Sequence, residues 1–175
     1  MMMDDYLENW VTSVRATLAE MAEMDWGYPI GTNDVRERSA ERHVVPPSLE
    51  PFYAICDGAS LMDVFVGYDI HPSWMVEAAA RRGWPTRIEG KSPRAIHVFG
   101  SDGGGSMFAL GTEDGAVYYL PNEALIEDGV YEENELCPVR RVAGSVVEFL
   151  ERLKGDIEAF VRGDEDHPYM TRWPT

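Results

Sequence analysis

The sequence predicts an α+β fold in which helices pack on one face of a mainly antiparallel sheet of about four to six strands. Two observations support this prediction. Apolar residues recur at steps of three and four near both ends of the 175-residue chain, a pattern typical of amphipathic helices. Between them, short apolar runs alternate with glycine- and aspartate-rich turns, as in antiparallel hairpins. The length suits one domain and no change in composition marks a linker, so we expect a single domain over residues 1–175.

The first expected element is a helix over about residues 5–24. Asp4 and Asp5 can cap its amino-terminal end. Its apolar face is formed by residues at helical spacing, namely Leu7, Trp10, Val11, Val14, Leu18 and Met21. The pattern ends near residues 27–29. Residues 31–43 are polar and lack a sustained period, so we expect a loop or a short irregular helix there.

Shorter elements follow. Ser48 is expected to cap a second helix, which Gly58 ends by supplying a left-handed conformation. Residues 61–70 form an apolar run that predicts a strand, with Gly67 at a bulge. Residues 71–83 then predict another short helix.

The middle of the chain is rich in strand signals. Residues 95–99, 106–110 and 116–120 predict three strands joined by turns, and a fourth strand is expected within residues 124–131. The last element is a helix that begins after Ser145.

That final helix has a recognisable start and a continuous apolar stripe. Ser145 and Glu148 form a capping box, in which each side chain can satisfy a free backbone amide. The stripe runs to Val161 and is expected to pack in the core. We expect the tail over residues 163–175 to be frayed.

The charge of the chain excludes several classes of partner. It has 15 basic and 31 acidic residues, which give a net charge of −16, and such a field repels nucleic-acid phosphates and anionic membranes. No lysine or arginine occurs from Ala95 to Val139, where nine acids do: Asp102, Glu113, Asp114, Glu123, Glu127, Asp128, Glu132, Glu133 and Glu135. A basic protein is the complementary partner. The alternative is that the acidity only keeps the protein soluble.

Basic residues gather in the segment before this acidic region: Arg81, Arg82, Arg87, Lys91 and Arg94. We expect them to be solvated and to form salt bridges within the molecule. The acidic amino terminus lacks the features of a signal peptide, and no apolar run approaches the ~20 residues that span a bilayer. Cys56 and Cys137 lie too far apart to suggest a zinc knuckle or a disulfide framework, so we expect a cytoplasmic, reduced protein.

No motif for catalysis or for cofactor binding stands out. The glycines at 103–105 precede a predicted strand, whereas a phosphate-binding loop precedes a helix, so a tight turn is the better interpretation. Asp102, Glu113 and Asp114 lack the calcium-loop order and are interpreted as solvated turn acids, with weak divalent binding as the alternative. The four histidines are scattered, and Cys56 falls on an apolar helix face. We therefore predict no catalytic residue, metal or cofactor, and an enzyme with an unrecognised site is the alternative.

Five segments together resemble a known family. They are residues 45–53 (VPPSLEPFY), 57–61 (DGASL), 96–105 (IHVFGSDGGG), 114–120 (DGAVYYL) and 145–150 (SVVEFL). In this order and spacing they resemble the SUKH superfamily, which includes bacterial immunity proteins and a fungal cell-wall synthesis regulator. The resemblance covers about residues 44–161. The family more commonly has asparagine where this chain has Asp57, and both residues tolerate the turn at Gly58.

The resemblance implies a SUKH-like α+β fold without catalytic residues, and many members neutralise a cognate toxin, often a nuclease. Nuclease domains are commonly basic, which would explain the excess of acids. The family carries over no site residues, so the candidate contacts come from the acidic region: Asp102, Glu113, Asp114, Glu127, Asp128, Glu132, Glu133, Tyr118 and Tyr131. The sequence thus predicts an immunity protein that binds a basic toxin. The alternatives are a regulatory scaffold that binds an enzyme or a signalling protein, and contact residues that are merely exposed.

Overall fold

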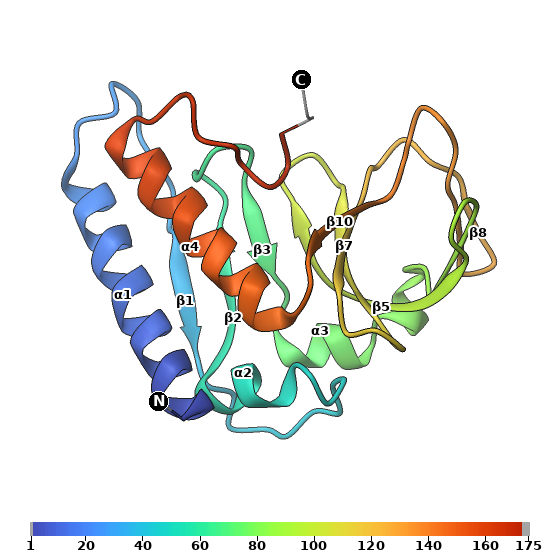
Figure 1. The fold of residues 1–175 in the computed structure, drawn as a ribbon. Helices are drawn as coiled ribbons and strands as arrows, with labels where there is room; N and C mark the ends of the chain where they lie inside the picture. Colours follow the sequence, from blue (N-terminus) through green and yellow to red (C-terminus); the bar gives the residue numbers. More distant parts are fainter. Residues whose placement is uncertain (1, 173–175) are drawn as a thin grey trace.

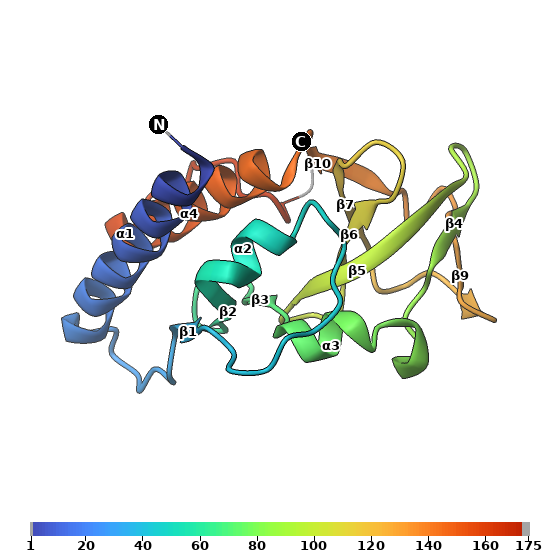
Figure 2. The same cartoon turned by 90° about the horizontal axis from the view of Figure 1, so that it is seen from below.

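The computed structural model of the chain describes residues 2–172. Two long helices, α1 (Met3–Glu23) and α4 (Val146–Arg162), lie side by side over one face of a large sheet (Figures 1 and 2). The α+β class is confirmed, and both helices begin within two residues of the predicted positions. No helix among residues 2–172 is both long and apolar enough to cross a membrane.

The main part of the sheet contains seven strands, and every neighbouring pair in it is antiparallel. In spatial order they are β1 (Asp34–Glu37), β2 (Cys56–Leu61), β3 (Tyr68–Ile70), β5 (Arg94–Asp102), β6 (Met107–Gly111), β7 (Val117–Leu120) and β10 (Arg140–Ala143). The sheet reaches ten strands in total, so the prediction of four to six strands was too small.

The three remaining strands form a branch beside β5. β4 (Arg87–Glu89) pairs antiparallel with the beginning of β5, and β9 (Val130–Glu132) runs parallel to β4. β8 (Ile126–Glu127) pairs with β9 and forms the outer edge of this branch. The single strand predicted within residues 124–131 is therefore a tight hairpin. We call residues 121–139 the hairpin lobe.

The central strands β5, β6 and β7 are buried on both faces. On one face, Phe108 packs against Phe149 of α4 at a ring separation of 5.1 Å. On the same side, the Trp10 indole of α1 donates a hydrogen bond of 2.7 Å to the Leu150 carbonyl. The opposite face forms a second core, which contains Tyr118 of β7 and Tyr131 of the hairpin lobe among other buried residues. Burial on both faces explains why β6 and β7 are continuously apolar rather than alternating.

The shorter elements differ more from the prediction. α2 (Glu50–Ile55) and α3 (Ser73–Glu77) lie along the lower end of the sheet in Figure 1, and η1 (Ala80–Arg82) follows α3. Ser48 does not cap α2, whose N-cap position is Leu49. Gly58 lies inside β2 rather than at a helix end. Its φ is 86°, and its backbone lies against the carbonyl oxygens of β3 and the residue after it, where a side chain would collide.

The other two differences concern residues 61–70 and the carboxyl-terminal tail. In the first segment, Leu61 is the last residue of β2, residues 62–66 form turns and a bend, and only Tyr68–Ile70 forms a separate strand. The prediction of a frayed tail is wrong for residues 164–172. The buried Asp156 carboxylate of α4 accepts hydrogen bonds from the Met170 amide at 3.1 Å and faces the His167 ring at 2.8 Å. Tyr169 stacks on Phe65 at 3.9 Å, and residues 173–175 lie outside the described residues.

Candidate functional site

The hairpin lobe is built around a two-residue turn and an internal tyrosine. Asp128 and Gly129 have φ values of 49° and 76°, as a type I′ turn between two strands requires. Tyr131 is 0% exposed, and its hydroxyl donates a hydrogen bond of 2.7 Å to the Pro121 carbonyl. Tyr131 therefore anchors the lobe to the second core. The prediction that it contacts a partner is corrected, because its ring faces inward.

The outer surface of the lobe combines apolar and acidic side chains. Leu125, Ile126 and Leu136 are 56%, 39% and 83% exposed. Five exposed carboxylates surround them in the sequence: Glu123, Glu127, Asp128, Glu132 and Glu135. None of these five forms an ion pair with another residue in the described range 2–172. We call these eight residues the acidic–apolar patch.

The patch also contains an open strand edge. β8 pairs with β9 on one side, and no other strand among the described residues pairs with its second side. Exposed edges present unpaired backbone groups that an extended segment of another chain can use. Three predicted contact residues, Glu127, Asp128 and Glu132, lie together on this hairpin. Sequence reasoning missed the three apolar members, although Leu136 directly follows four polar residues.

The acids of the β6–β7 turn are in a different setting. Glu113 is exposed, whereas Asp114 accepts hydrogen bonds from the Tyr118 hydroxyl at 2.5 Å and from the Arg94 guanidinium at 3.1 Å. Burial opposes ionisation of Asp114, but the hydrogen bond from Tyr118 and the charge of Arg94 outweigh it, so the carboxyl pKa lies below its usual value. Tyr118 is 6% exposed with Arg94 stacked 4.3 Å from its ring centre. The prediction of Tyr118 as a partner contact is therefore also corrected.

Asp102 has a structural position. One of its oxygens accepts the amides of Gly104 at 2.8 Å and Ser106 at 2.9 Å, and the other accepts the Tyr119 hydroxyl at 2.7 Å. These bonds shape the glycine turn between β5 and β6 that the sequence predicted. Burial, together with the hydrogen bond to Asp102, raises the pKa of Tyr119 to about 12. Asp102 is 9% exposed and faces inward, which corrects its prediction as a contact residue.

Glu133 joins the hairpin lobe to its neighbours. Its two carboxylate oxygens accept the backbone amides of Lys91 at 3.3 Å and Val139 at 2.9 Å. It is half-buried, so it offers less to a partner than the three hairpin acids do. The basic residues before the acidic region were expected to form salt bridges within the molecule. Two of them do, because Arg87 pairs with Glu89 and Arg94 pairs with Asp114.

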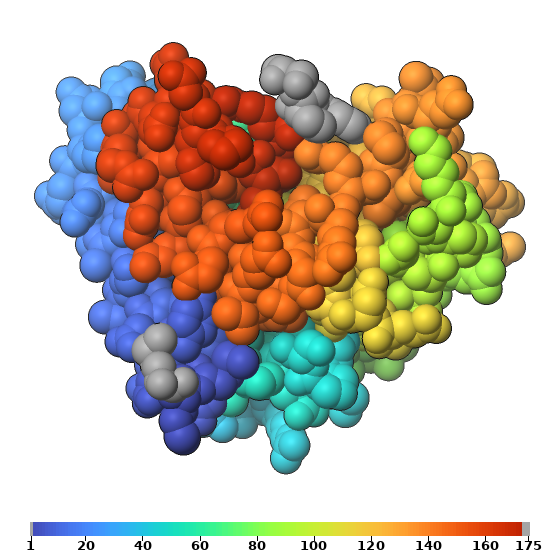
Figure 3. Space-filling view, in the orientation of Figure 1, coloured from blue at the N-terminus to red at the C-terminus, as the bar shows by residue number. Residues whose placement is uncertain are grey.

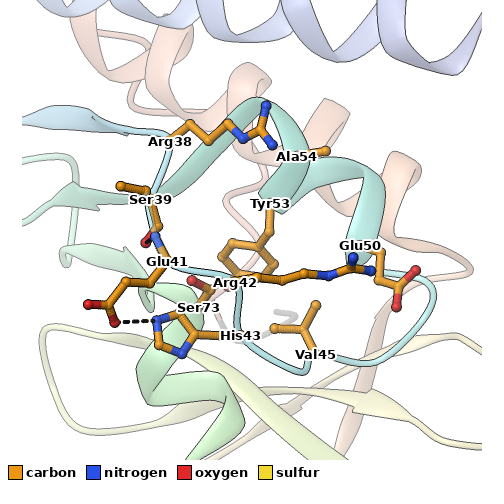
Figure 4. A pocket seen from close by; sticks show the side chains of 11 residues that line it. Arg38, Ser39, Glu41, Arg42, His43, Val45, Glu50, Tyr53, Ala54 and Ser73 are labelled. Atoms are coloured by element: carbon orange, nitrogen blue, oxygen red, sulfur yellow. Dashed lines mark hydrogen bonds and ion pairs between the residues drawn. The ribbon is translucent and has the colours of Figure 1, made fainter.

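A second concave region lies between residues 38–43 and α2. Figure 4 shows this pocket of about 330 Å³, with Tyr53 inside it and Arg42 extending across it. The His43 ring faces Glu77 at 3.0 Å through Nδ1 and Glu41 at 3.8 Å through Nε2. Within the described residues no hydroxyl or thiol is hydrogen-bonded to His43, so the pocket does not present a nucleophile and base together.

Another set of residues superficially matches a catalytic triad. His71 Nε2 lies 3.1 Å from the Ser101 hydroxyl and 3.7 Å from an Asp69 carboxylate oxygen. A triad needs serine and aspartate on different ring nitrogens, whereas His71 Nδ1 is buried without a hydrogen-bond partner among residues 2–172. Burial lowers the pKa of His71 to about 4. The arrangement therefore lacks the geometry of a relay.

The described residues contain no group of three or more histidine, cysteine or acidic side chains placed to hold a metal ion. Both cysteines are buried, and burial raises the pKa of Cys56 to about 12. Comparisons of the chain with family models, with curated proteins and with solved structures gave no match. The geometry that best suits an interaction is the acidic–apolar patch, which combines exposed apolar side chains, unpaired carboxylates and an open edge strand.

Proposed function

We propose that this chain is a non-catalytic binding module whose acidic–apolar patch docks a basic protein. The observation that supports the proposal is the exposure of Leu125, Ile126 and Leu136 among carboxylates that have no ion-pair partner in residues 2–172. Exposed apolar groups within a polar rim are typical of protein-binding surfaces.

Charge and apolar contact would have separate roles. A net charge of −16 attracts a basic partner over distance and raises the association rate. Once the surfaces meet, burial of the leucines would slow dissociation, because buried apolar anchors dominate the affinity of most interfaces. The open edge of β8 would accept an extended segment of the partner by strand addition.

The resemblance to the SUKH superfamily suggests which basic partner to test. We infer an immunity protein that occludes a cognate nuclease-type toxin, working in the cytoplasm where that toxin would reach nucleic acid. A nuclease must hold phosphate and is therefore basic, which complements the patch. The same surface would also serve a regulatory scaffold, so the partner's activity distinguishes these two functions.

The direct experiment uses the product of the neighbouring gene as the binding probe. Association and dissociation rates would be measured at several salt concentrations, together with rescue of cells that express that product. The variant Leu125→Ser/Leu136→Ser should raise the dissociation rate about tenfold or more, because two apolar anchors are lost. Glu127→Gln/Glu132→Gln should instead slow association and flatten its salt dependence.

A matched control lies on α1, where Glu8 and Glu20 are exposed and unpaired among the described residues. Glu8→Gln/Glu20→Gln removes the same amount of charge as Glu127→Gln/Glu132→Gln. Because α1 lies outside the acidic–apolar patch, the control should leave the dissociation rate and the rescue unchanged. Equal effects from both acidic pairs would contradict the assigned surface. Absence of both binding and rescue would contradict the toxin partner. Binding of a non-toxic product through the patch would support the regulatory scaffold.

A further inference from the structure

A cationic pocket lies next to the hairpin lobe, where residues just outside the lysine- and arginine-free segment 95–139 meet that segment. Its volume is about 480 Å³, which lies within the range for small-molecule sites. It is formed where the β4–β5 loop, the β6–β7 turn, the end of the lobe and β10 meet. Segments of these colours, lime, yellow and orange, adjoin one another on the right of Figure 3.

The two carboxylates of this pocket, Asp114 and Glu133, already accept hydrogen bonds from other residues of the chain. Asp114 accepts the Ala116 amide at 3.1 Å in addition to the hydrogen bonds from Tyr118 and Arg94. Glu133 accepts one backbone amide on each of its oxygens, as described above. These carboxylates are therefore held by neutral donors and by Arg94. Arg141 lowers the carboxyl pKa of Asp114 and of Glu148 through its charge, but it contacts neither carboxylate directly.

Three cations line the same pocket. Arg94 is fixed by Asp114, by the Tyr118 ring and by a hydrogen bond of 3.1 Å to the Ser92 carbonyl. Lys91 and Arg141 are exposed, and their side chains form no ion pair or hydrogen bond with another residue in the range 2–172. The pocket thus has three positive groups and two negative ones in a molecule of net charge −16.

We propose that this pocket binds the phosphate group of a small phosphate monoester. Arginine presents a planar fork and lysine a compact charge, and both are common phosphate ligands. Because Lys91, Ser92, Arg94 and Arg141 line one pocket, we infer that the three cations would bind different oxygens of one tetrahedral group, with the Ser92 hydroxyl as a further donor. A single carboxylate has two oxygens and would leave one cation unused. Val139 and Tyr118 also line the pocket and would contact the organic part of the ester.

The overall negative charge does not prevent such binding but does limit the size of the ligand. At physiological salt the Debye length is about 8 Å, so a small anion in the pocket responds mainly to the local cations. A nucleic acid would extend over the surrounding carboxylates and be repelled. The pocket should therefore accept a phosphate monoester and reject an oligonucleotide.

The experiment is an NMR titration of the full chain in a phosphate-free buffer, with inorganic phosphate and phenyl phosphate as probes. We expect saturable shifts of the Ser92, Asp114 and Arg141 amides, with phenyl phosphate binding more tightly than inorganic phosphate. Arg141→Gln and Lys91→Gln should each weaken binding by about fivefold to tenfold, because each removes one charge-assisted contact. Both side chains are exposed, and an unchanged amide spectrum away from the pocket would show that the variants fold.

The matched control removes two positive charges elsewhere. Arg38 and Arg42 line the pocket of Figure 4 and form no ion pair among the described residues, so Arg38→Gln/Arg42→Gln should leave phosphate affinity unchanged. An equal loss in this control would overturn the proposal in favour of diffuse attraction. No saturable shift at millimolar probe, or tighter binding of a 10-nucleotide single strand than of phenyl phosphate, would also overturn it.

Discussion

The two faces of the central strands are closed by different kinds of structure. On one face, α1 and α4 are helices of 21 and 17 residues that bury rings such as Trp10 and Phe149. On the other, the hairpin lobe has strands of two and three residues and exposes leucines to solvent. The comparison suggests a division of roles, in which the helical face supplies stability and the lobe supplies a surface for recognition.

The largest expected effect lies on the helical face. Phe149 is 1% exposed and packs against Phe99 at 5.3 Å and Phe108 at 5.1 Å. Phe149→Ala should lower the free energy of unfolding by about 3–5 kcal/mol, because it removes a large ring from a core that cannot fully collapse. Denaturant unfolding followed by circular dichroism measures this change. A loss below about 1 kcal/mol would mean that the helical face is not the main source of stability.

The next effect lies at the junction of the two regions. His71 stacks on Trp84 at 4.5 Å, and Trp84 leads into β4 beside the lobe. Burial lowers the folded pKa of His71 from 6.5 to about 4, so the unfolded chain binds a proton first as the pH falls. Stability from neutral His71 is therefore present above pH 6.5 and is lost between about pH 6.5 and 4, by about 3 kcal/mol.

Unfolding of the wild type and His71→Gln across this pH range tests the sign and the size. The variant loses the titrating ring, so its stability should vary less between pH 6.5 and pH 4 than that of the wild type. Carboxylates titrate at the lower end of the range in both proteins. The test therefore uses the difference in unfolding free energy between the wild type and the variant at each pH. Parallel pH profiles would show that folding does not lower the pKa of His71.

A smaller effect is expected within the lobe. Tyr131→Phe removes the hydroxyl that donates to the Pro121 carbonyl and should cost about 1 kcal/mol. Because Tyr131 belongs to the second core, which contains no residue of α1 or α4, faster hydrogen exchange should be confined to residues 121–139, while α1 and α4 remain protected. Equal loss of protection in α4 would show that the lobe and the helical face unfold together, and the comparison would then fail.

The same division explains how far the sequence could predict this molecule. α1 and α4 were predictable because their apolar faces repeat over several turns and Ser145 caps α4 through the Glu148 amide at 3.1 Å. β1 and β2 were not, because β1 has only four largely polar residues and β2 contains an Asp-Gly pair that is typical of a turn. Gly58 looked like a helix end but is required by close contact with β3.

The site shows the same limit. The excess of acids and the position of the hairpin acids Glu127 and Glu132 could be predicted from local sequence. The inward position of Tyr118 could not, because it depends on the lobe folding back over the second face of the sheet. The surroundings of Asp114 could not be predicted either. Arg94 pairs with Asp114 and Arg141 lines the same pocket, because β5 and β10 bring both arginines there from outside the arginine-free segment.

The smallest stability effect concerns the most exposed apolar residue. Leu136 is 83% exposed, so Leu136→Ser should change the free energy of unfolding by less than about 0.5 kcal/mol. Leu150→Ser is the matched control on the helical face, where a 1% exposed leucine becomes polar and should cost several-fold more. If the two variants unfolded at similar denaturant concentrations, Leu136 would have to be packed in solution. The lobe would then contribute to stability as α4 does, and the acidic–apolar patch would lose its most accessible contact.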